Sequence, residues 1–247
     1  MKEVVLRNRA AFEDILAHYE ISDHGKKVLH DVRYVVLLAV TAGGRNTIIR
    51  QLLKSGKYKQ VISDTTRPPK LRDGKMEEHG VNYYFREEED LLQELKDGEF
   101  LEAELIHNQQ VSGTSIRELE AIAESGKIGI NEIDFGGTKN LLEAKPDTDA
   151  FAIFPPSYDE WQSRFKNREK ITDREYMNRL NTALKIIKTV RADERIKVVI
   201  NDDYVGAAQM IDSIIDGHVE TAHEHEAVEL MLHNYEENIK AELKRVI

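Results

Sequence analysis

The 247-residue chain contains no cysteine. Disulfides, thiolate metal sites and cysteine nucleophiles are therefore excluded, and we expect a protein of the reducing cytoplasm. Long hydrophobic runs are missing as well, since the longest, Val35–Val40, is far too short to span a bilayer. The first residues are charged and lack the apolar stretch of a secretory signal, so we expect no membrane association.

The chain also lacks an excess of positive charge. Its formal net charge is −10, which makes a non-specific nucleic-acid partner a poor expectation. An anionic phosphate ligand would have to be bound by a local cluster of cations and backbone N–H groups. The content of 40% hydrophobic and 32% charged residues is typical of a globular protein.

Hydrophobic patterning predicts an α/β fold. The apolar run at 34–40 is typical of a strand buried on both faces, and a glycine-containing loop and a helix follow it. Further short apolar runs alternate with helical patterns, which indicates a parallel sheet flanked by helices. These further strands are expected at 58–62, 129–134, 151–154 and 196–200. Among the helices, one is expected from about Thr114 to Glu124 and one from Asp173 to Ala192.

Amphipathic helices are expected near both ends of the chain, around 7–20 and 219–247. Their apolar stripes predict that the terminal helices pack on the core or on each other, and a homodimer through them is one such arrangement. Between the second strand and about residue 115, polar turns, a charged helix and short strands indicate a small α+β insertion.

The loop after the first strand has the context of a phosphate-binding loop but not its sequence. The motif G-x-x-x-x-G-K-(S/T) binds phosphates with backbone N–H groups and a lysine, and its hydroxyl binds magnesium. Here Ala39 stands at the first glycine, Arg45 at the lysine and Asn46 at the hydroxyl position. Ala42 also stands at a glycine position, where its methyl would crowd a backbone of positive φ. Judged by the motif alone, this segment could also be an ordinary turn between a strand and a helix.

Three other segments suggest phosphate and base chemistry. Ser63–Lys70 and Gly80–Phe85 combine hydroxyls, cations and tyrosines, a set that suits a phosphate monoester. Carboxylates at strand ends can accept hydrogen bonds from a guanine base, and arginines beside a polar turn can close over phosphates. Taken singly, these segments also suit a surface hairpin, a solvated strand end and exposed helical arginines.

The histidines near the C-terminus give no metal motif. His223 and His225 are two residues apart and would face different sides of a helix, and the H-E-x-x-H spacing is absent. We therefore expect solvated histidines there.

Taken together and in this order, the segments resemble the guanylate kinase family. The family pattern is a phosphate loop, S-x-T-T-R-x-P-R, G-x-x-Y-x-F, E-F-x-E, Y-G-T-S, D-I-D-x-x-G, P-P-S, an arginine-bearing lid and N-D-D. The corresponding segments of this chain are Ser63–Lys70, Gly80–Phe85, Glu99–Glu102, Ser112–Ser115, Glu132–Gly137, Pro155–Ser157 and Asn201–Asp203. The resemblance covers roughly residues 33–215.

The resemblance implies a P-loop NTPase-type core with an insertion that binds GMP and a lid. The implied division is an N-terminal helical extension at 1–32, a guanylate kinase-like domain at 33–215 and a C-terminal helix at 216–247. The GMP-binding insertion is expected at about 63–115 and the lid at about 164–179.

The implied site residues follow position by position. The GMP phosphate would be bound by Ser63, Arg67, Lys70 and Tyr83, and the guanine by Glu102, Thr114 and Asp134. The ATP side would be formed by Gly43, Gly44, Arg45, Asn46, Thr47 and Asn201, with Asn201 near the adenine. Charge on the transferred phosphate would be stabilised by Arg45, Arg164, Arg168 and Arg179. The implied reaction converts ATP and GMP to ADP and GDP with magnesium, for which Asn46 would be a weak ligand.

Departures from the family pattern leave the activity open. Lys70 replaces a second arginine, Ser112 replaces a tyrosine, and the phosphate loop has lost its lysine and hydroxyl. Three hypotheses remain: an atypical kinase with weakened activity, an inactive nucleotide-binding protein, and a protein-interaction module. Because the GMP side is largely intact and the lid arginines remain, the sequence favours nucleotide chemistry.

Overall fold

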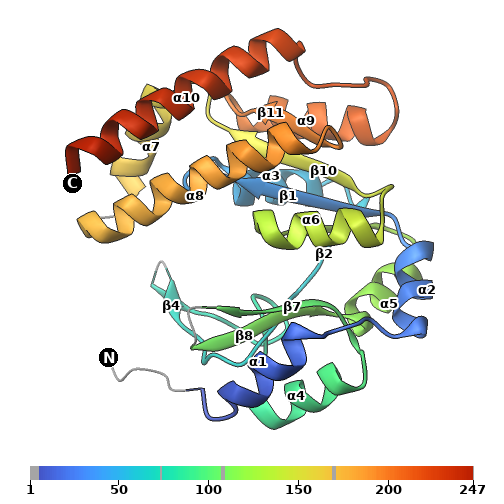
Figure 1. Cartoon of the computed structure of the whole chain (residues 1–247). Helices are drawn as coiled ribbons and strands as arrows, with labels where there is room; N and C mark the ends of the chain where they lie inside the picture. The colour runs from blue at the N-terminus through green and yellow to red at the C-terminus, as the bar shows by residue number, and fades with distance from the viewer. Residues whose placement is uncertain (1–5, 73, 107–108, 169–170, 247) are drawn as a thin grey trace. The chain divides into compact units, whose positions relative to one another are not determined.

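The computed structural model describes residues 6–72, 74–106, 109–168 and 171–246. The chain divides into two compact units. One, here called the insertion unit, comprises Met1–Arg33 and Lys59–Gly129, and the other, the core unit, comprises Tyr34–Tyr58 and Ile130–Ile247. Figure 1 shows the elements of both units coloured along the chain.

A parallel sheet forms the centre of the core unit. Its central strands are β1 (Tyr34–Ala39), β10 (Asp149–Phe154) and β11 (Ile196–Ile200). They pair in parallel, with Val36 opposite Ala150 and Ala152 opposite Val198. The full strand order is β11-β10-β1-β9-β2, where β9 (Ile128–Glu132) and β2 (Tyr58–Gln60) cross the boundary between the units.

Helices flank this sheet. They are α3 (Arg45–Leu53), α6 (Phe135–Ala144), α7 (Tyr158–Arg168), α8 (Asp173–Ala192), α9 (Tyr204–Ile215) and α10 (His225–Val246). Helix α3 packs against α9, α6 packs against α8, and α10 lies along α8 and α7 (Figure 1). The predicted α/β class with a parallel sheet flanked by helices is therefore confirmed.

The insertion unit contains a smaller, mixed sheet of order β6-β3-β8-β7. Its strands are β3 (Asp64–Thr65), β6 (Tyr84–Phe85), β7 (Phe100–Ile106) and β8 (Gln110–Ser115), and β4 (Leu71–Arg72) pairs with β5 (Lys75–Met76) in a separate hairpin. Its helices are α1 (Arg9–Ala17), α2 (Asp23–Asp31), α4 (Glu88–Lys96) and α5 (Ile116–Ser125). Helices α1 and α4 enclose a core with the sheet, formed by Leu6, Phe12, Leu91, Leu92, Leu95, Phe100 and Val111.

Two elements of the insertion unit differ from the sequence expectation. Residues 110–115 form a strand, so the helix expected from Thr114 begins at Ile116. The strand exists because it pairs with β7, and Gly113 allows the close approach, since a Cβ there would lie 2.4 Å from the Glu102 carbonyl oxygen. Helix α2 was not predicted, and its Ser22 cap accepts from the Gly25 N–H at 3.1 Å.

The apolar stripes of both terminal helices have buried members within their own units. Phe12 of α1 is fully buried in the insertion unit, and Leu232, Tyr235 and Ile239 of α10 are fully buried in the core unit. Across the described residues, no helix combines the length and apolarity that crossing a membrane requires.

Candidate functional site

The loop between β1 and α3 makes a tight turn at the position of the expected phosphate loop. The Gly43 N–H donates to the Val40 carbonyl at 2.9 Å. Ala42 has a φ of +59° and, in the part of the chain that the structure describes, is the single non-glycine residue with a positive φ. The Ala42 methyl therefore crowds the backbone, as the sequence predicts for a positive φ. This strain costs roughly 1–2 kcal/mol of stability for an L-residue.

Asn201 holds this loop from the end of β11. The side chain is buried, and its Nδ2 donates to the Gly43 carbonyl at 2.7 Å. Gly44, with a φ of +94°, makes room for that amide, because a Cβ there would lie 2.1 Å from Nδ2. The predicted place of Asn201 beside the adenine stays a prediction, and its observed contact supports the loop.

Arg45 begins α3, and its guanidinium turns toward the end of β9. Nη2 donates to the Glu132 carboxylate at 2.8 Å. Nη1 lies 3.4 Å from the Leu37 carbonyl and 3.5 Å from the Ile133 carbonyl. The arginine at the motif's lysine position therefore already contacts an acid and two backbone carbonyls.

The lid arginines fall into three different situations. Arg164 donates to Glu160 at 2.7 Å and to the Asn201 carbonyl at 2.9 Å, so it reaches the residue that holds the loop. Arg179 pairs with Glu175 one helical turn away at 2.7 Å and is half-exposed. Arg168 is the last residue of α7, and its side chain lies outside the described residues.

Asp134, expected to bind the guanine, caps helix α6 of the core unit. Its Oδ1 accepts from the Gly137 N–H at 2.8 Å. A carboxylate at this position is favoured by the helix dipole and by the free N–H groups of the first turn. Gly137 lies close to the Ile133 side chain, since a Cβ on Gly137 would lie 2.5 Å from it.

In the insertion unit, Arg67 is buried in a bidentate ion pair. Its Nη1 and Nη2 donate to Glu77 at 2.5 and 3.0 Å, and the two side chains are only 5% and 2% exposed. The guanidinium lies over the ring of Tyr83 at 4.6 Å and near that of Phe85 at 5.7 Å. Glu77 also accepts from the Lys70 backbone N–H at 3.0 Å, so one acid organises the whole turn.

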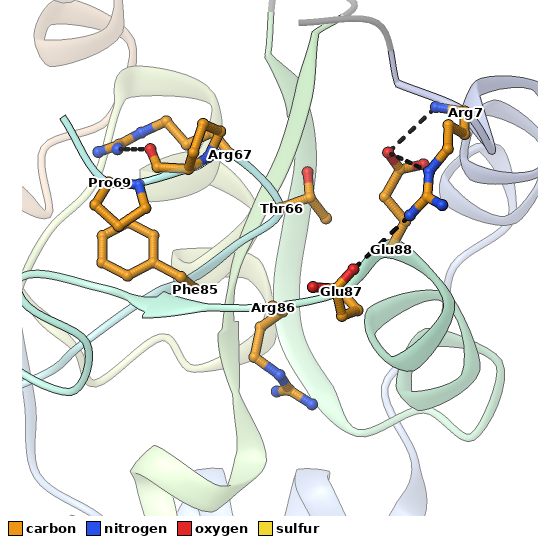
Figure 2. Close-up of a pocket in the computed structure, with 9 residues that line it drawn as sticks. Arg7, Thr66, Arg67, Pro69, Phe85, Arg86, Glu87 and Glu88 are labelled. Atoms are coloured by element: carbon orange, nitrogen blue, oxygen red, sulfur yellow. Dashed lines mark hydrogen bonds and ion pairs between the residues drawn. The ribbon is translucent and has the colours of Figure 1, made fainter.

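A pocket of the insertion unit lies beside this turn (Figure 2). Figure 2 shows Arg67, Pro69 and Phe85 on one side of it and Arg7 with Glu87 and Glu88 on the other. Each charged side chain on its wall has an opposite charge within ion-pair distance: Arg7 pairs with Glu88 at 3.8 Å and Arg67 with Glu77. The wall is therefore balanced in charge rather than basic.

Glu102 and Thr114 face each other across strands β7 and β8. They are register partners, and the Thr114 hydroxyl donates to the Glu102 carboxylate at 2.8 Å. Close by, the hydroxyls of Thr65 and Ser112 are 2.7 Å apart, with Ser112 at the position of the family's tyrosine. Ser63 is half-buried, and the Lys70 side chain is exposed.

A family model described as guanylate kinase matches residues 31–217. The chain belongs to the guanylate kinase family. Guanylate kinase of Legionella pneumophila (strain Lens) is 29% identical over 181 residues, 73% of this chain and 83% of that protein. Guanylate kinase of Chlamydia felis (strain Fe/C-56) is 33% identical over 178 residues, 71% of this chain and 83% of that protein.

The fold agrees with this membership. The crystal structure of guanylate kinase from Anaplasma phagocytophilum matches with a TM-score of 0.56 and 25% identity, over 76% of this chain and 86% of that one. The chain therefore has the P-loop NTPase-type fold of the guanylate kinases and is classed with enzymes of the kinase type.

The guanylate kinase positions fall into local groups within each unit. In the core unit, Asn201 links Gly43 to Arg164 through direct hydrogen bonds. In the insertion unit, the Arg67 guanidinium lies over the Tyr83 ring, and the Thr114 hydroxyl donates to Glu102. Thr47 continues α3 with its N–H bonded to the Gly44 carbonyl.

Magnesium, usual for guanylate kinases, does not fit the residues of this loop. In P-loop proteins the ion is held by the loop hydroxyl and by an acid at a strand end. Here the hydroxyl position is Asn46, and Glu132 at the end of β9 is paired with Arg45 at 2.8 Å. Among the described residues, no cluster of three or more His, Cys, Asp or Glu side chains could hold a metal.

The sequence analysis missed several buried charges of the insertion unit. Asp64 is fully buried between Arg86 at 2.6 Å and Arg117 at 3.0 Å. Hydrogen bonds with Glu94 and then Asp64 raise the pKa of Arg86 despite burial. No sequence motif contains these residues. The single signal is that an arginine, Arg86, stands between two acids, Asp64 and Glu94, in the chain.

Glu118 is a second missed residue. It is buried in α5 and accepts from the Ile62 N–H and the Tyr84 hydroxyl, each at 3.0 Å. Burial raises the pKa of Tyr84, and the hydrogen bond to Glu118 adds to the rise. Glu118 thus anchors the link between β2 and β3, where the Ser63–Lys70 segment begins.

Proposed function

We propose that the protein transfers a phosphoryl group from ATP to GMP, giving ADP and GDP, with turnover weakened by the altered loop. The observation that carries the proposal is the Glu102–Thr114 pair, a carboxylate and a hydroxyl 2.8 Å apart on neighbouring strands. A carboxylate can accept hydrogen bonds from the N–H groups of guanine, and a hydroxyl can both donate and accept. Membership of the guanylate kinase family supports this assignment of the substrate.

Each remaining group has a proposed task in the acceptor site. Arg67, Lys70, Ser63 and Tyr83 bind the GMP phosphate. Glu77 fixes the guanidinium of Arg67 through two of its nitrogens. Asp134 adds a second carboxylate for the base, and its cap bond to α6 uses Oδ1 only.

The donor side is proposed to work through backbone N–H groups and arginines. The loop Gly43–Thr47 binds the ATP phosphates at the start of α3, where the helix dipole favours negative charge. Arg45, Arg164, Arg168 and Arg179 stabilise charge on the transferred group, and Asn201 lies on the adenine side. Phosphoryl transfer depends on such positioning and charge stabilisation.

A second candidate function is GMP binding without transfer. The observation that favours it is the Arg45–Glu132 ion pair, which holds the loop's cation away from a ligand. The homodimer through the terminal helices and the cytoplasmic location stay predictions.

The test combines an ADP-release assay with calorimetric binding of GMP and ATP. We expect turnover with GMP and much less with AMP or CMP. Glu102→Ala should raise the KM for GMP by about 10- to 100-fold, as for a lost hydrogen bond to a charged group. Glu124→Gln, an exposed carboxylate of α5 in the same unit, is the matched control.

The outcomes separate the candidates. Saturable GMP binding with no ADP release supports the binding protein without transfer. Binding of neither GMP nor ATP contradicts both and leaves the protein-interaction module.

A further inference from the structure

Arg45 stands at the position of the motif's lysine, and its guanidinium lies beside an acid that could bind a loop magnesium. Arg45 follows Gly44, the N-cap of α3, and its side chain is 27% exposed. Its Nη2 contacts Glu132 at 2.8 Å, and its Nη1 faces the Leu37 and Ile133 carbonyls. One side chain therefore connects the start of α3 to β1 at Leu37 and to the end of the neighbouring strand β9.

Glu132 is the acid that a loop-bound metal would need. It is the last residue of β9, the strand beside β1, and P-loop proteins take a metal ligand from a strand end of this kind. A carboxylate already bonded by a guanidinium has lost both charge and lone pairs to that partner. A divalent ion would have to displace Arg45 before it could bind Glu132.

The second expected ligand has also been replaced. Asn46 has an amide where the motif has a hydroxyl, and its backbone carbonyl accepts from Arg50 Nε at 3.1 Å. An amide oxygen carries no charge, so it cannot compensate for a neutralised Glu132. The loss of the hydroxyl and the pairing of Glu132 with Arg45 are two separate changes, and each weakens magnesium binding at the loop.

We propose that Arg45 takes over the role of the loop magnesium, so that nucleotide phosphates bind at this loop without help from Mg²⁺. The guanidinium is a permanent cation with a planar fork of donors, which suits phosphate oxygens. Glu132 pairs with Nη2 of that fork, so phosphate oxygens have to compete with this carboxylate for the guanidinium. This inference rests on the proposed binding of ATP at 43–47 and adds that the divalent ion is dispensable there.

The experiment measures ATP binding to the full chain by calorimetry, without GMP, in excess Mg²⁺ and again in EDTA. In the wild type, the Kd in Mg²⁺ should be no more than about threefold tighter than in EDTA. In Arg45→Lys/Asn46→Ser, which restores the motif's lysine and hydroxyl and removes the guanidinium from Glu132, Mg²⁺ should tighten binding by about tenfold or more.

Glu132→Gln gives an independent test that does not require the double variant to fold. If Glu132 only holds Arg45, its neutralisation removes a negative charge near the phosphates. ATP binding should then tighten by about threefold to tenfold in both media, as expected for one unit charge at short range in solvent. If Glu132 is a metal ligand instead, the variant weakens binding in Mg²⁺ alone, and the proposal is overturned.

The remaining outcomes also decide. A wild type that binds ATP tenfold more tightly with Mg²⁺ overturns this inference and leaves the proposed function standing. A wild type that binds ATP in neither medium overturns both. The fluorescence of Trp161, which donates to the Thr41 carbonyl at 2.6 Å, reports loop binding in parallel.

Discussion

Arg67 and Glu77 place opposite charges side by side in a nearly water-free turn. Their side chains are 5% and 2% exposed, so each depends on the other for charge compensation. Breaking a buried pair by removing one partner is more harmful than removing both, because a lone buried charge remains. This pair therefore decides whether the turn between Arg67 and Glu77 keeps its shape.

We predict that Glu77→Ala lowers the free energy of unfolding by about 3 kcal/mol, since Arg67 is left buried and unpaired. The double change Arg67→Met/Glu77→Leu should recover most of that loss. Urea denaturation followed by far-ultraviolet circular dichroism measures both. Equal destabilisation by the single and double variants would contradict the argument, because it would show that packing rather than charge is lost.

Ala42 supports a second prediction at the residue scale. Its φ of +59° is strained for alanine but not for glycine. Ala42→Gly should raise the stability of the core unit by about 0.5–1 kcal/mol, the relief of strain less the added entropy of the unfolded chain. Denaturation followed by Trp161 fluorescence measures this change in stability. Ala39→Gly is the matched control, because Ala39 has no positive φ to relieve and its replacement by glycine should destabilise the protein.

At the scale of elements, His223 connects the α9–α10 link to the end of β11. Its Nε2 accepts from the Ile200 backbone N–H at 3.0 Å, so the ring must be neutral to make the bond. Partial burial lowers the pKa of His223 from its ordinary value of 6.5. The histidine expected to be solvated is thus half-buried and holds a strand end.

Because the pKa of His223 is lowered in the folded chain, the free energy of unfolding depends on pH. Above about pH 6.5 the ring is neutral in both folded and unfolded chains, and the full contribution to stability is present. As the pH falls, the unfolded chain takes up a proton first, so stability decreases until the folded pKa is passed. His223→Gln keeps an acceptor without titrating. The unfolding free energy of the wild type should fall more than that of the variant between about pH 7 and pH 5.

Element-scale prediction succeeded where the sequence pattern was long and local. The buried run at 34–40 and the helical periodicity of 173–192 both correspond to observed elements, β1 and α8. It failed at 114–115, because these polar residues belong to a strand that forms through pairing with β7 and β3. At the site, the altered loop was visible in the sequence. The acids that engage Arg45 and Arg67 were not, because only the fold brings Glu132 and Glu77 to them.

At the scale of the whole molecule, the family match ends at residue 217, yet the core unit continues through α10. Tyr235 of that helix is fully buried, stacks on Trp161 at 5.5 Å and donates to the Pro155 and Ser157 carbonyls at 2.9 Å each. Arg191 of α8 adds ion pairs to Glu229 and Glu236. Helix α10 therefore completes the core around α7 and α8.

We predict that deleting residues 219–247 destabilises the core unit and shifts Trp161 fluorescence to the red, because the ring loses the cover of Tyr235. Tyr235→Ala should cost about 3–5 kcal/mol, as for a large aromatic removed from a core. Leu230→Ala is the matched control, since Leu230 lies on the same helix and is 71% exposed. Tyr235→Phe, which keeps the ring and removes the hydroxyl, should cost about 1–2 kcal/mol. A deletion variant with unchanged melting temperature and emission would show that α10 is a dispensable appendage of the kinase-like fold.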